Sequence, residues 1–570
     1  MNGSFSPARL TRAALALAAW LFALRVAVDT LRTVVPLWSP LPWFDEWATV
    51  ELIRAWQGHE MSGFDVLFAQ HNEHRILVPR LVFFADDLLC GGGGRLSLAA
   101  IMLVQALHAG LFAALLARAR PAAPGRWAVA GLILALMFSL RQAENFTYGF
   151  QVQFVGVFAG ASVSFALFGL AVARHRAGRG LIGPLLATAL ALLATTFTMA
   201  NGLAAGVVVA ALSLLARMPR RVTLACAAWA GLLAAVYLHD YVPVAHHSHP
   251  SESLAHPLGL LLYTATYLGG MAAPGPALLP PLLGLFGLAA MAGAGLRALR
   301  RGAGPVELAL LGIMAFAAAA AAVTGAGRLG FGIDQALSSR YATGSAAFWS
   351  ALLAYGCIVA PRLPPRPAAL TRAGLVTAAA LLALAMGRAQ EAAKPAIVAQ
   401  SFALGESGDL LLLGLHDPEV LGRSAWVVPD AERLAPVLRA NHLSVFATPE
   451  AAALGGPVAS LGTPAAPGAC RGEVAARADP SLGADGVRVS GTGLAGSRLV
   501  RRILLADGRG DLVGLGAGAV PGAPRGHWRG VARAGTGTAL TAYGLLAGPS
   551  LCRLGSTSVE PPAAGPPPSQ

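Results

Sequence analysis

The chain has 570 residues, of which 55% are hydrophobic and only 12% charged, and its mean hydropathy is +0.61. Because a soluble protein carries about 25% charged residues, this composition excludes an ordinary soluble enzyme. The net charge of +14 does not indicate a nucleic-acid-binding protein, since the arginines lie in short segments between apolar runs. We expect a polytopic membrane protein, mainly α-helical, whose partner is the lipid bilayer and not nucleic acid.

The first apolar run, residues 13–36, follows Arg9 and Arg12 and has no convincing small-residue cleavage site after it. We therefore expect an uncleaved anchor, a cytoplasmic N-terminus and an outside loop over residues 38–95. Five later connections are arginine-rich and are expected in the cytoplasm: 118–126, 174–179, 217–221, 297–301 and 362–372. Further spans are expected at 97–117, 127–141, 150–173, 181–199, 203–216, 222–238, 279–296, 306–323, 341–360 and 373–387.

One apolar stretch does not fit this alternation of sides. If residues 257–273 crossed the bilayer, Arg297 would lie outside, against the positive-inside rule. We therefore predict that this stretch is re-entrant or interfacial, which gives eleven crossings and an outside C-terminus. The alternative is that Arg297 breaks the rule and there are twelve crossings.

The composition changes after Arg388. We divide the chain into a transmembrane domain (1–388), a periplasmic α/β connecting region (389–465), a small periplasmic β-sandwich-like domain (466–556) and a disordered Pro/Gly-rich tail (557–570). Cys470 and Cys552 bracket most of the β-domain and are a plausible disulfide in an oxidising compartment, or else two free thiols.

Polar residues that composition does not explain gather in the predicted outer loops. The first loop holds Asp45, Glu46, His71, Asn72, Glu73, His74, Arg75, Arg80, Asp86 and Asp87, and later ones hold Gln142, Glu144, Asn145, Gln151, Asn201, His246, His247, His249, Arg328, Asp334 and Arg340. The cytoplasmic connections hold arginine, proline and little else. Since ionisable groups near a membrane tend to mark a function, we expect the site on the outer face.

This mixture suits the transfer of a group from a lipid-linked donor. A carboxylate just beyond a span can act as general base, which makes Asp45 the candidate catalytic base with Glu46 as its partner. Arg75, Arg328 and Arg340 are candidates to clamp the donor phosphate. The alternative for Arg328 and Arg340 is a surface network in which they pair with Asp334. His71, Asn72, His74, Glu144 and Asn201 would shape the acceptor side.

Two further interpretations stay open. His71 and His74 are three residues apart, so a helix would place them on one face, where they could bind a divalent metal together with Asp45. No cofactor is certain. Trp43 and Trp47 are either residues of the membrane interface or faces on which a sugar stacks.

The acidic pair directly after the first span, Phe44-Asp45-Glu46-Trp47, resembles the GT-C superfamily of membrane glycosyltransferases. The resemblance covers the architecture of residues 10–390 and this one motif. The block 70–75, the segment 336–341 and the β-domain look like those of bacterial polytopic membrane proteins of unassigned activity. The resemblance implies a polyprenyl-phosphate sugar donor and an outside C-terminal domain.

The function expected from the sequence is an inner-membrane glycosyltransferase that acts, with inversion, on a cell-envelope glycan or lipid at the periplasmic face. A polysaccharide polymerase or ligase is one alternative. A non-enzymatic polysaccharide transporter or assembly component is another, disfavoured because the mid-span positions are mostly Ala, Leu and Gly and no internal repeat is evident.

Overall fold

The computed structural model describes residues 7–119, 125–244, 255–466, 468–496, 498–546, 548 and 550–562. The chain forms two compact units. Unit 1 comprises Met1–Pro36, Leu67–Val82 and Ser97–Lys394, and unit 2 comprises Leu37–Val66, Phe83–Leu96 and Pro395–Gln570. The first outer loop, expected as one segment over 38–95, is therefore shared between the two units.

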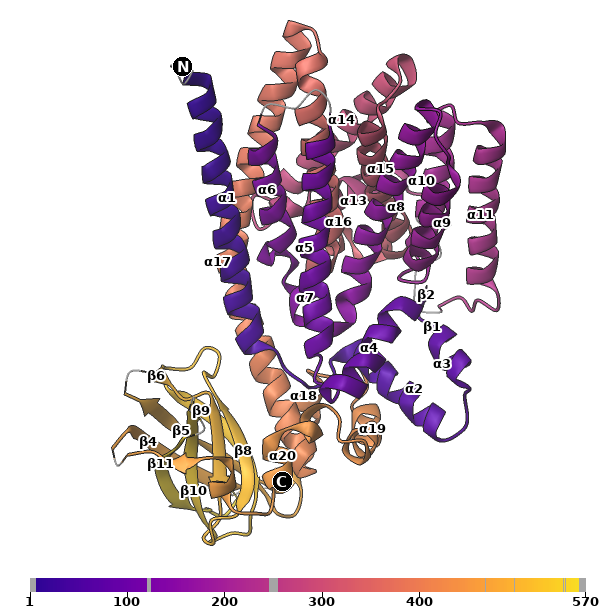
Figure 1. The fold of residues 1–570 in the computed structure, drawn as a ribbon. Coiled ribbons are helices and arrows are strands. Elements are labelled where there is room, and N and C mark those ends of the chain that lie inside the picture. The colour runs from indigo at the N-terminus through magenta and orange to yellow at the C-terminus, as the bar shows by residue number, and fades with distance from the viewer. Residues whose placement is uncertain are drawn as a thin grey trace. The chain divides into compact units, whose positions relative to one another are not determined.

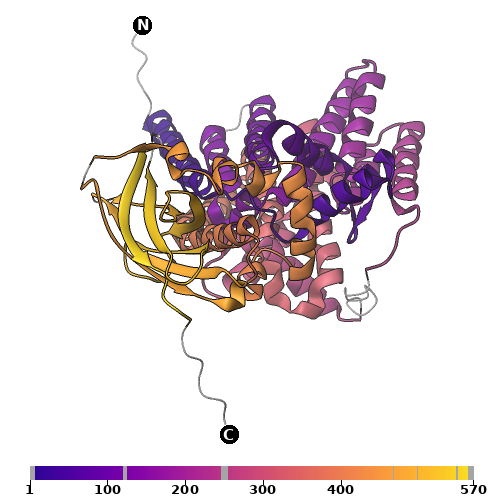
Figure 2. The same ribbon diagram turned by 90° about the horizontal axis from the view of Figure 1, so that it is seen from below.

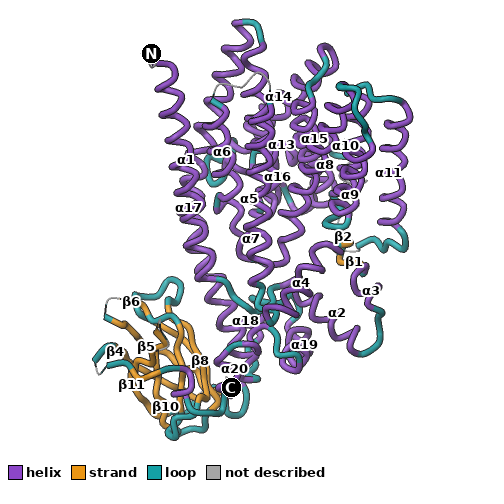
Figure 3. The backbone as a smooth tube through the Cα atoms, in the orientation of Figure 1, coloured by secondary structure: helices purple, strands orange, loops and turns teal. Residues whose placement is uncertain are grey.

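Unit 1 is built almost wholly of helices (Figures 1 and 3). They are α1 (Pro7–Val34), α5 (Arg95–Arg118), α6 (Arg126–Phe138), α7 (Ala143–Thr147), α8 (Val152–Arg176), α9 (Ile182–Thr196), α10 (Gly202–Leu215), α11 (Arg220–Leu238), α13 (Pro257–Leu268), α14 (Leu279–Arg301), α15 (Pro305–Arg328) and α16 (Ala342–Val359). The helices α4 (Leu77–Cys90) and α17 (Pro365–Leu413) are divided between the two units, and the first two residues of α5 also belong to unit 2.

Nine helices among the described residues are long and apolar enough to span a membrane. Three apolar helices are shorter: α9, α10 and α13. Sequence features explain where the long ones begin and end. Pro280 stands in the first turn of α14 and Pro305 in that of α15, where the missing N–H costs no hydrogen bond. Arg300 and Arg301 end α14, where positive charge complements the helix dipole.

Helix α16 lies at the centre of unit 1, and its apolar window is fully buried. Small residues permit this position. A Cβ on Gly344 would come within 2.6 Å of both the Phe158 ring and the Tyr267 hydroxyl, so a glycine is needed for their close approach. The 3-10 turns η7 (Ile333–Leu337) and η8 (Ser339–Tyr341) connect α15 to α16.

Helix α13 packs along its length against the first turns of α14, the last turn of α15 and the first turns of α16. Its first turn approaches Leu329, at the end of α15, and its last carbonyl, that of Leu268, accepts hydrogen bonds from the Ser345 hydroxyl and, at 2.9 Å, from the Trp349 indole. Ser345 and Trp349 lie in the first two turns of α16. With 12 residues, α13 is about 18 Å long, shorter than the roughly 30 Å hydrocarbon core.

Unit 2 combines short helices with a β-sheet domain. The helices are α2 (Trp47–Gln57), α3 (Gly63–Phe68), α18 (Pro418–Leu421), α19 (Val428–Ala440) and α20 (Pro449–Ala453), of which α3 runs two residues into unit 1. The strands are β3 (Thr463–Pro464), β4 (Cys470–Ala478), β5 (Gly486–Ala495), β6 (Arg498–Leu499), β7 (Arg502–Ala506), β8 (Leu512–Gly518), β9 (His527–Arg533), β10 (Ala539–Leu546) and β11 (Ser550–Ser558).

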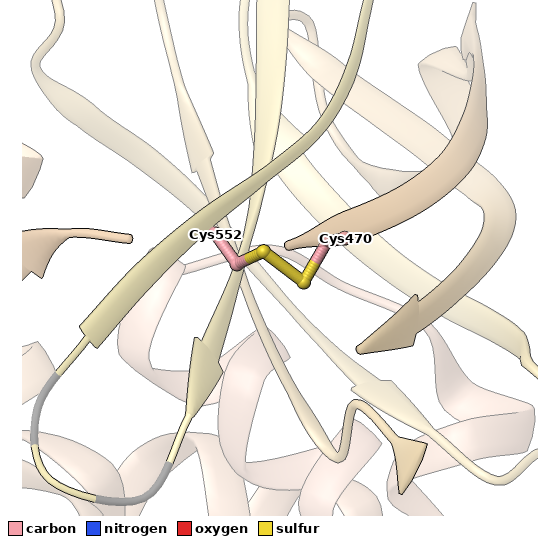
Figure 4. The surroundings of a disulfide bond; sticks show 2 residues. All are labelled: Cys470 and Cys552. Carbon is pink, nitrogen blue, oxygen red and sulfur yellow. A yellow bond between two sulfur atoms is a disulfide. The ribbon is translucent and has the colours of Figure 1, made fainter. Parts of the chain in front are cut away.

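The strands of this domain form one continuous nine-stranded sheet in the order β3-β11-β10-β7-β8-β9-β5-β4, with β6 paired to β5. The sheet is strongly curled (Figure 2), and the β4 edge returns to the segment after β11, where the Ala478 N–H donates to the Glu560 carbonyl at 2.9 Å. The predicted disulfide is confirmed: Cys470 on β4 is bonded to Cys552 on β11 (Figure 4). The folded domain thus extends past residue 556, and residues 563–570 lie outside the described part of the chain.

Both faces of the central strands are buried in unit 2. Along β7, Ile503 and Leu505 point into the core enclosed by the sheet, whereas Leu504 packs with the leucines of α17 and α19. The alternation follows from the two-residue period of a strand. It explains why the run Ile503-Leu504-Leu505 is apolar at every position.

Candidate functional site

The acidic pair after the first span lies in a short 3-10 turn of unit 2, η2 (Phe44–Glu46). The Oε2 atom of Glu46 accepts a hydrogen bond from the Trp43 N–H at 2.8 Å, so this carboxylate holds the turn together. Phe44 has a φ of +45°, which is rare for a bulky side chain. Backbone strain of this kind clusters at functional sites, and here it directly precedes Asp45.

Hydrogen bonds fasten this turn to the segment 423–426 of the same unit. The Phe44 N–H and the Trp47 indole both donate to the Ser424 carbonyl, at 2.8 and 3.2 Å. The Trp43 indole donates to the neighbouring carbonyl, that of residue 423, at 3.2 Å. Trp47 is 5% exposed. The expectation that it is an interfacial or sugar-stacking residue is therefore wrong, since its side chain anchors the turn that carries Asp45.

The block 70–75 forms a small β-hairpin in unit 1. Strands β1 (Gln70–His71) and β2 (His74–Arg75) are antiparallel and pair His71 with His74. Asn72, with a φ of +48°, lies in the turn, and its side chain is 3.2 Å from His71 Nε2. The two histidines are thus cross-strand neighbours, and the expectation of one helix face is wrong.

The structure gives no support to a metal at these histidines. Among the described residues, no group of three or more His, Cys, Asp or Glu side chains is arranged to hold a metal ion. Asp45, the third ligand of that hypothesis, belongs to unit 2. His246, His247 and His249 lie outside the described residues.

The guanidinium of Arg75 donates hydrogen bonds to backbone carbonyls of unit 1. Its Nε donates to the Tyr237 carbonyl and its Nη1 to the Phe68 carbonyl, at 2.8 and 2.9 Å, and its Nη2 donates to the His239 carbonyl. The guanidinium thereby ties the hairpin to the end of α11. This role removes Arg75 from the donor clamp that the sequence suggests.

Two other arginines of this unit are used in the same way. Arg80 is 2% exposed and donates to the Leu67 carbonyl at 3.0 Å, and burial lowers its pKa to about 10. Arg141 donates to the carbonyls of Gly270 and Leu337 at 2.9 and 2.5 Å. Both side chains hold loops together and leave little of their hydrogen-bonding capacity for a ligand.

Arg328 and Arg340 are engaged differently, because each faces a carboxylate at long range. Arg328 Nη2 lies 3.4 Å from Glu73 Oε1, and that same oxygen is 3.5 Å from His74 Nε2. Arg340 Nη1 lies 3.6 Å from Glu144 Oε1. These distances exceed the roughly 2.7–2.9 Å of a tight charge-assisted hydrogen bond. The side chains of Arg328 and Arg340 are 24% and 28% exposed.

The two arginine–glutamate pairs belong to one cluster around tyrosines. Tyr263 of α13 interacts electrostatically with both Arg328 and Arg340, and also with Tyr341. The ring of Tyr341 stacks on that of Tyr267, with centroids 5.2 Å apart. We call Glu73, His74, Glu144, Tyr263, Arg328, Arg340 and Tyr341 the outer cluster.

The segment 338–345 fixes the geometry of the outer cluster. The Ser339 hydroxyl accepts from the Glu144 N–H at 3.1 Å, and Asn145, fully buried, donates to the Arg340 carbonyl at 3.0 Å. The sequence suggests Asp334 as the partner of Arg328 and Arg340, but the carboxylates that face them in the structure are Glu73 and Glu144. Tyr263 is a member that sequence reasoning missed, since a tyrosine in an apolar stretch carries no signal of its own.

The remaining candidates lie apart from this arrangement. Asn201 stands at the N-cap of α10, half-buried, and its side chain makes no capping hydrogen bond. Gln142 is fully buried, and its Oε1 accepts from the Gln105 amide at 2.9 Å, so it holds helices together. Gln151 is 2% exposed and its Oε1 lacks a hydrogen-bond partner among the described residues.

Comparison with known proteins yields no match to a family model, to a curated protein or to a solved structure.

Proposed function

We propose that this protein is an inner-membrane glycosyltransferase that moves a sugar from a polyprenyl-phosphate donor to a cell-envelope glycan or lipid at the periplasmic face. The observation that carries the proposal is the outer cluster. Its two arginine side chains, about a quarter exposed, each face a carboxylate at long range, and both interact electrostatically with Tyr263. A phosphate can replace such contacts at low cost and gain bidentate hydrogen bonds from both arginines.

The membrane arrangement proposed with this function has eleven crossings. Nine candidate spans and the shorter helices α9 and α10 supply them, and α13 would be re-entrant. The contacts of α13 support this, since it meets the first turns of α14 at Pro280 and Gly284, the last turn of α15 at Gly325, and the first turns of α16. The arginine-rich connections would then be cytoplasmic and the C-terminal domain periplasmic.

Accessibility of single cysteines tests this topology. In a chain with Cys90, Cys226 and Cys357 replaced by serine, an impermeant thiol reagent should label Gly63→Cys from the periplasm and leave Arg366→Cys unlabelled. Both positions are exposed in the structure. Labelling of Arg366→Cys from the periplasm would put the proposed site on the wrong side of the membrane.

In the proposed reaction, the bond from the sugar C1 to the donor phosphate oxygen breaks as a new bond forms from C1 to the acceptor hydroxyl oxygen. Arg328 and Arg340 would stabilise the negative charge that develops on the leaving phosphate. Asp45 is proposed, on sequence grounds, as the base that takes the acceptor proton. His71 and Asn72 are proposed to shape the acceptor side, and Glu46 supports the turn of Asp45.

Arg340→Lys is the sharpest test of the phosphate assignment, because lysine keeps the charge and loses the planar fork. We expect a rise in the donor KM of about ten-fold with unchanged protein yield. The matched control is Arg301→Lys, at the far end of α14. An unchanged donor KM in Arg340→Lys would contradict the assignment.

Asp45→Asn tests the base. We expect the transfer rate to fall on the order of 10²-fold or more, with the donor KM unchanged. Full complementation of a glycan-deficient deletion strain by Asp45→Asn would rule the base out. It would leave the polymerase or ligase alternative ahead, because that chemistry does not require a carboxylate at this position.

One observation favours the non-enzymatic transport alternative. His108, 2% exposed in the middle of α5, lies with its Nε2 2.8 Å from the Ser162 hydroxyl of α8. A buried ionisable group inside a span is a candidate relay for protons. The mid-span positions are therefore not uniformly apolar. His108→Phe should leave sugar transfer intact if the protein is the proposed enzyme, and abolish glycan export if it is a proton-coupled transporter.

A further inference from the structure

A cavity of about 640 Å³ lies between α14, α16 and α17 in unit 1. Its volume is within the roughly 300–1,000 Å³ of ligand sites in proteins. Apolar side chains line most of it, among them Phe286, Trp349 and Leu370. Phe286 is 45% exposed and Leu370 75% exposed, so the cavity opens sideways onto the apolar surface of the spans.

Three arginines line this cavity along α14: Arg297, Arg300 and Arg301. Arg297 is bound to Glu307, which also holds Arg362. Arg300 and Arg301 are exposed, and neither forms an ion pair with a carboxylate among the described residues. Arg300 and Arg301 therefore add positive charge beyond the network of Arg297, Arg362 and Glu307. The site combines an apolar groove with an excess of positive charge at one end.

Small residues make the room for the groove. Gly293 lines it, and a Cβ built there meets no atom within 4 Å. Gly295, on the same helix, is equally open but does not line the cavity. On α16, the Tyr355 hydroxyl donates to the Ala294 carbonyl at 3.4 Å, which holds α14 and α16 together on the inner side of the groove.

We propose that this cavity binds an anionic phospholipid of the bilayer, with an acyl chain along Phe286 and Trp349 and the phosphate against Arg300 and Arg301. Basic pockets between spans bind such headgroups, and arginines near the membrane surface attract anionic lipids. Apolar burial of the chain supplies the rest. The proposal requires only that these helices span a membrane and does not depend on sugar transfer.

The test is native mass spectrometry of the full-length protein, titrated in detergent with cardiolipin and, separately, with phosphatidylcholine. We expect wild type to retain cardiolipin in preference to phosphatidylcholine. Arg300→Gln/Arg301→Gln should weaken cardiolipin retention ten-fold or more. The matched control is Arg220→Gln/Arg221→Gln, an exposed arginine pair at the start of α11, which should behave as wild type.

A second pair of variants tests the groove itself. Gly293→Leu should fill the cavity and reduce cardiolipin retention to a similar degree, whereas Gly295→Leu should not. Folding of each variant is checked by its elution as a single species and by its thermal midpoint without added lipid. Wild-type retention in either Arg300→Gln/Arg301→Gln or Gly293→Leu would overturn the proposal, as would an equal loss in the two controls.

Discussion

The two ends of helix α15 use arginine in opposite ways. Near its start, Glu307 is 4% exposed and binds both Arg297, at 2.8 Å, and Arg362. At its other end, about 36 Å away along 24 residues, Arg328 stands 3.4 Å from the more exposed Glu73. The first arrangement is a buried structural network. In the second, the ion pair is longer and its carboxylate is 28% exposed, so the two arrangements differ in the burial of the carboxylate.

The largest effect is expected from removing the positive charges of Arg328 and Arg340. Arg328→Gln/Arg340→Gln should reduce sugar transfer on the order of 10³-fold, because each group is assigned to the leaving phosphate. The thermal midpoint should change little, since both side chains are about a quarter exposed. The measurement is transfer from a polyprenyl-phosphate sugar in detergent. If the variant instead failed to fold, Arg328 and Arg340 would be structural, as the arginines around Glu307 are, and the contrast would not hold.

Changes in the buried network around Glu307 should lower the stability of the protein. Glu307→Gln leaves Arg297 and Arg362 facing each other without a carboxylate, and we expect the free energy of unfolding to fall by about 2 kcal/mol. Glu391→Gln is the control, since Glu391 is 67% exposed in its pair with Lys394 and should matter by less than about 0.5 kcal/mol. Denaturant unfolding in detergent gives both values. Equal losses in the two variants would mean that burial is not the deciding factor.

Asp87, a largely buried carboxyl with no ion pair among the described residues, sharpens the comparison. Burial and the neighbouring Asp86 raise the pKa of Asp87 to about 7. The folded state thus binds a proton that the unfolded state releases near pH 4, so the carboxyl costs stability increasingly as pH rises from about 4 to 7. Asp87→Asn should be more stable than wild type at pH 8 and similar to it at pH 4. Thermal midpoints across this range check the sign, and a constant difference would refute it.

The smallest effect is expected from removing the negative charge of Glu144. Glu144 forms a 3.6 Å ion pair with Arg340 and would repel an incoming phosphate, so Glu144→Gln should tighten the binding of a sugar-free polyprenyl phosphate by a few-fold. Microscale thermophoresis in detergent can measure the change. Weaker binding would mean that Glu144 orients Arg340 for its ligand, and the long ion pair would then be structural.

Patterns local in sequence predicted much of this molecule. Apolar runs gave the candidate spans, and the spacing of Cys470 and Cys552 in a Gly-rich segment gave the disulfide. The hairpin that holds His71 and His74 could not be read this way, because its anchors, the carbonyls of Tyr237 and His239, are more than 160 residues away.

The partners of the arginines were also beyond sequence reasoning. Arg75 ends strand β2 and Arg328 ends helix α15, yet one donates to backbone carbonyls and the other faces Glu73. The choice depends on which distant segments fold beside each side chain. The anchoring of the Asp45 turn to Ser424, 377 residues from Trp47, has the same cause.

Binding of polyprenyl phosphate tests the central claim most directly, because it isolates the phosphate from the chemistry of transfer. Its Kd should rise more than ten-fold in Arg328→Gln/Arg340→Gln and stay at the wild-type value in Arg300→Gln/Arg301→Gln. Equal affinity of wild type and Arg328→Gln/Arg340→Gln would contradict the assignment of the outer cluster as the donor-phosphate site.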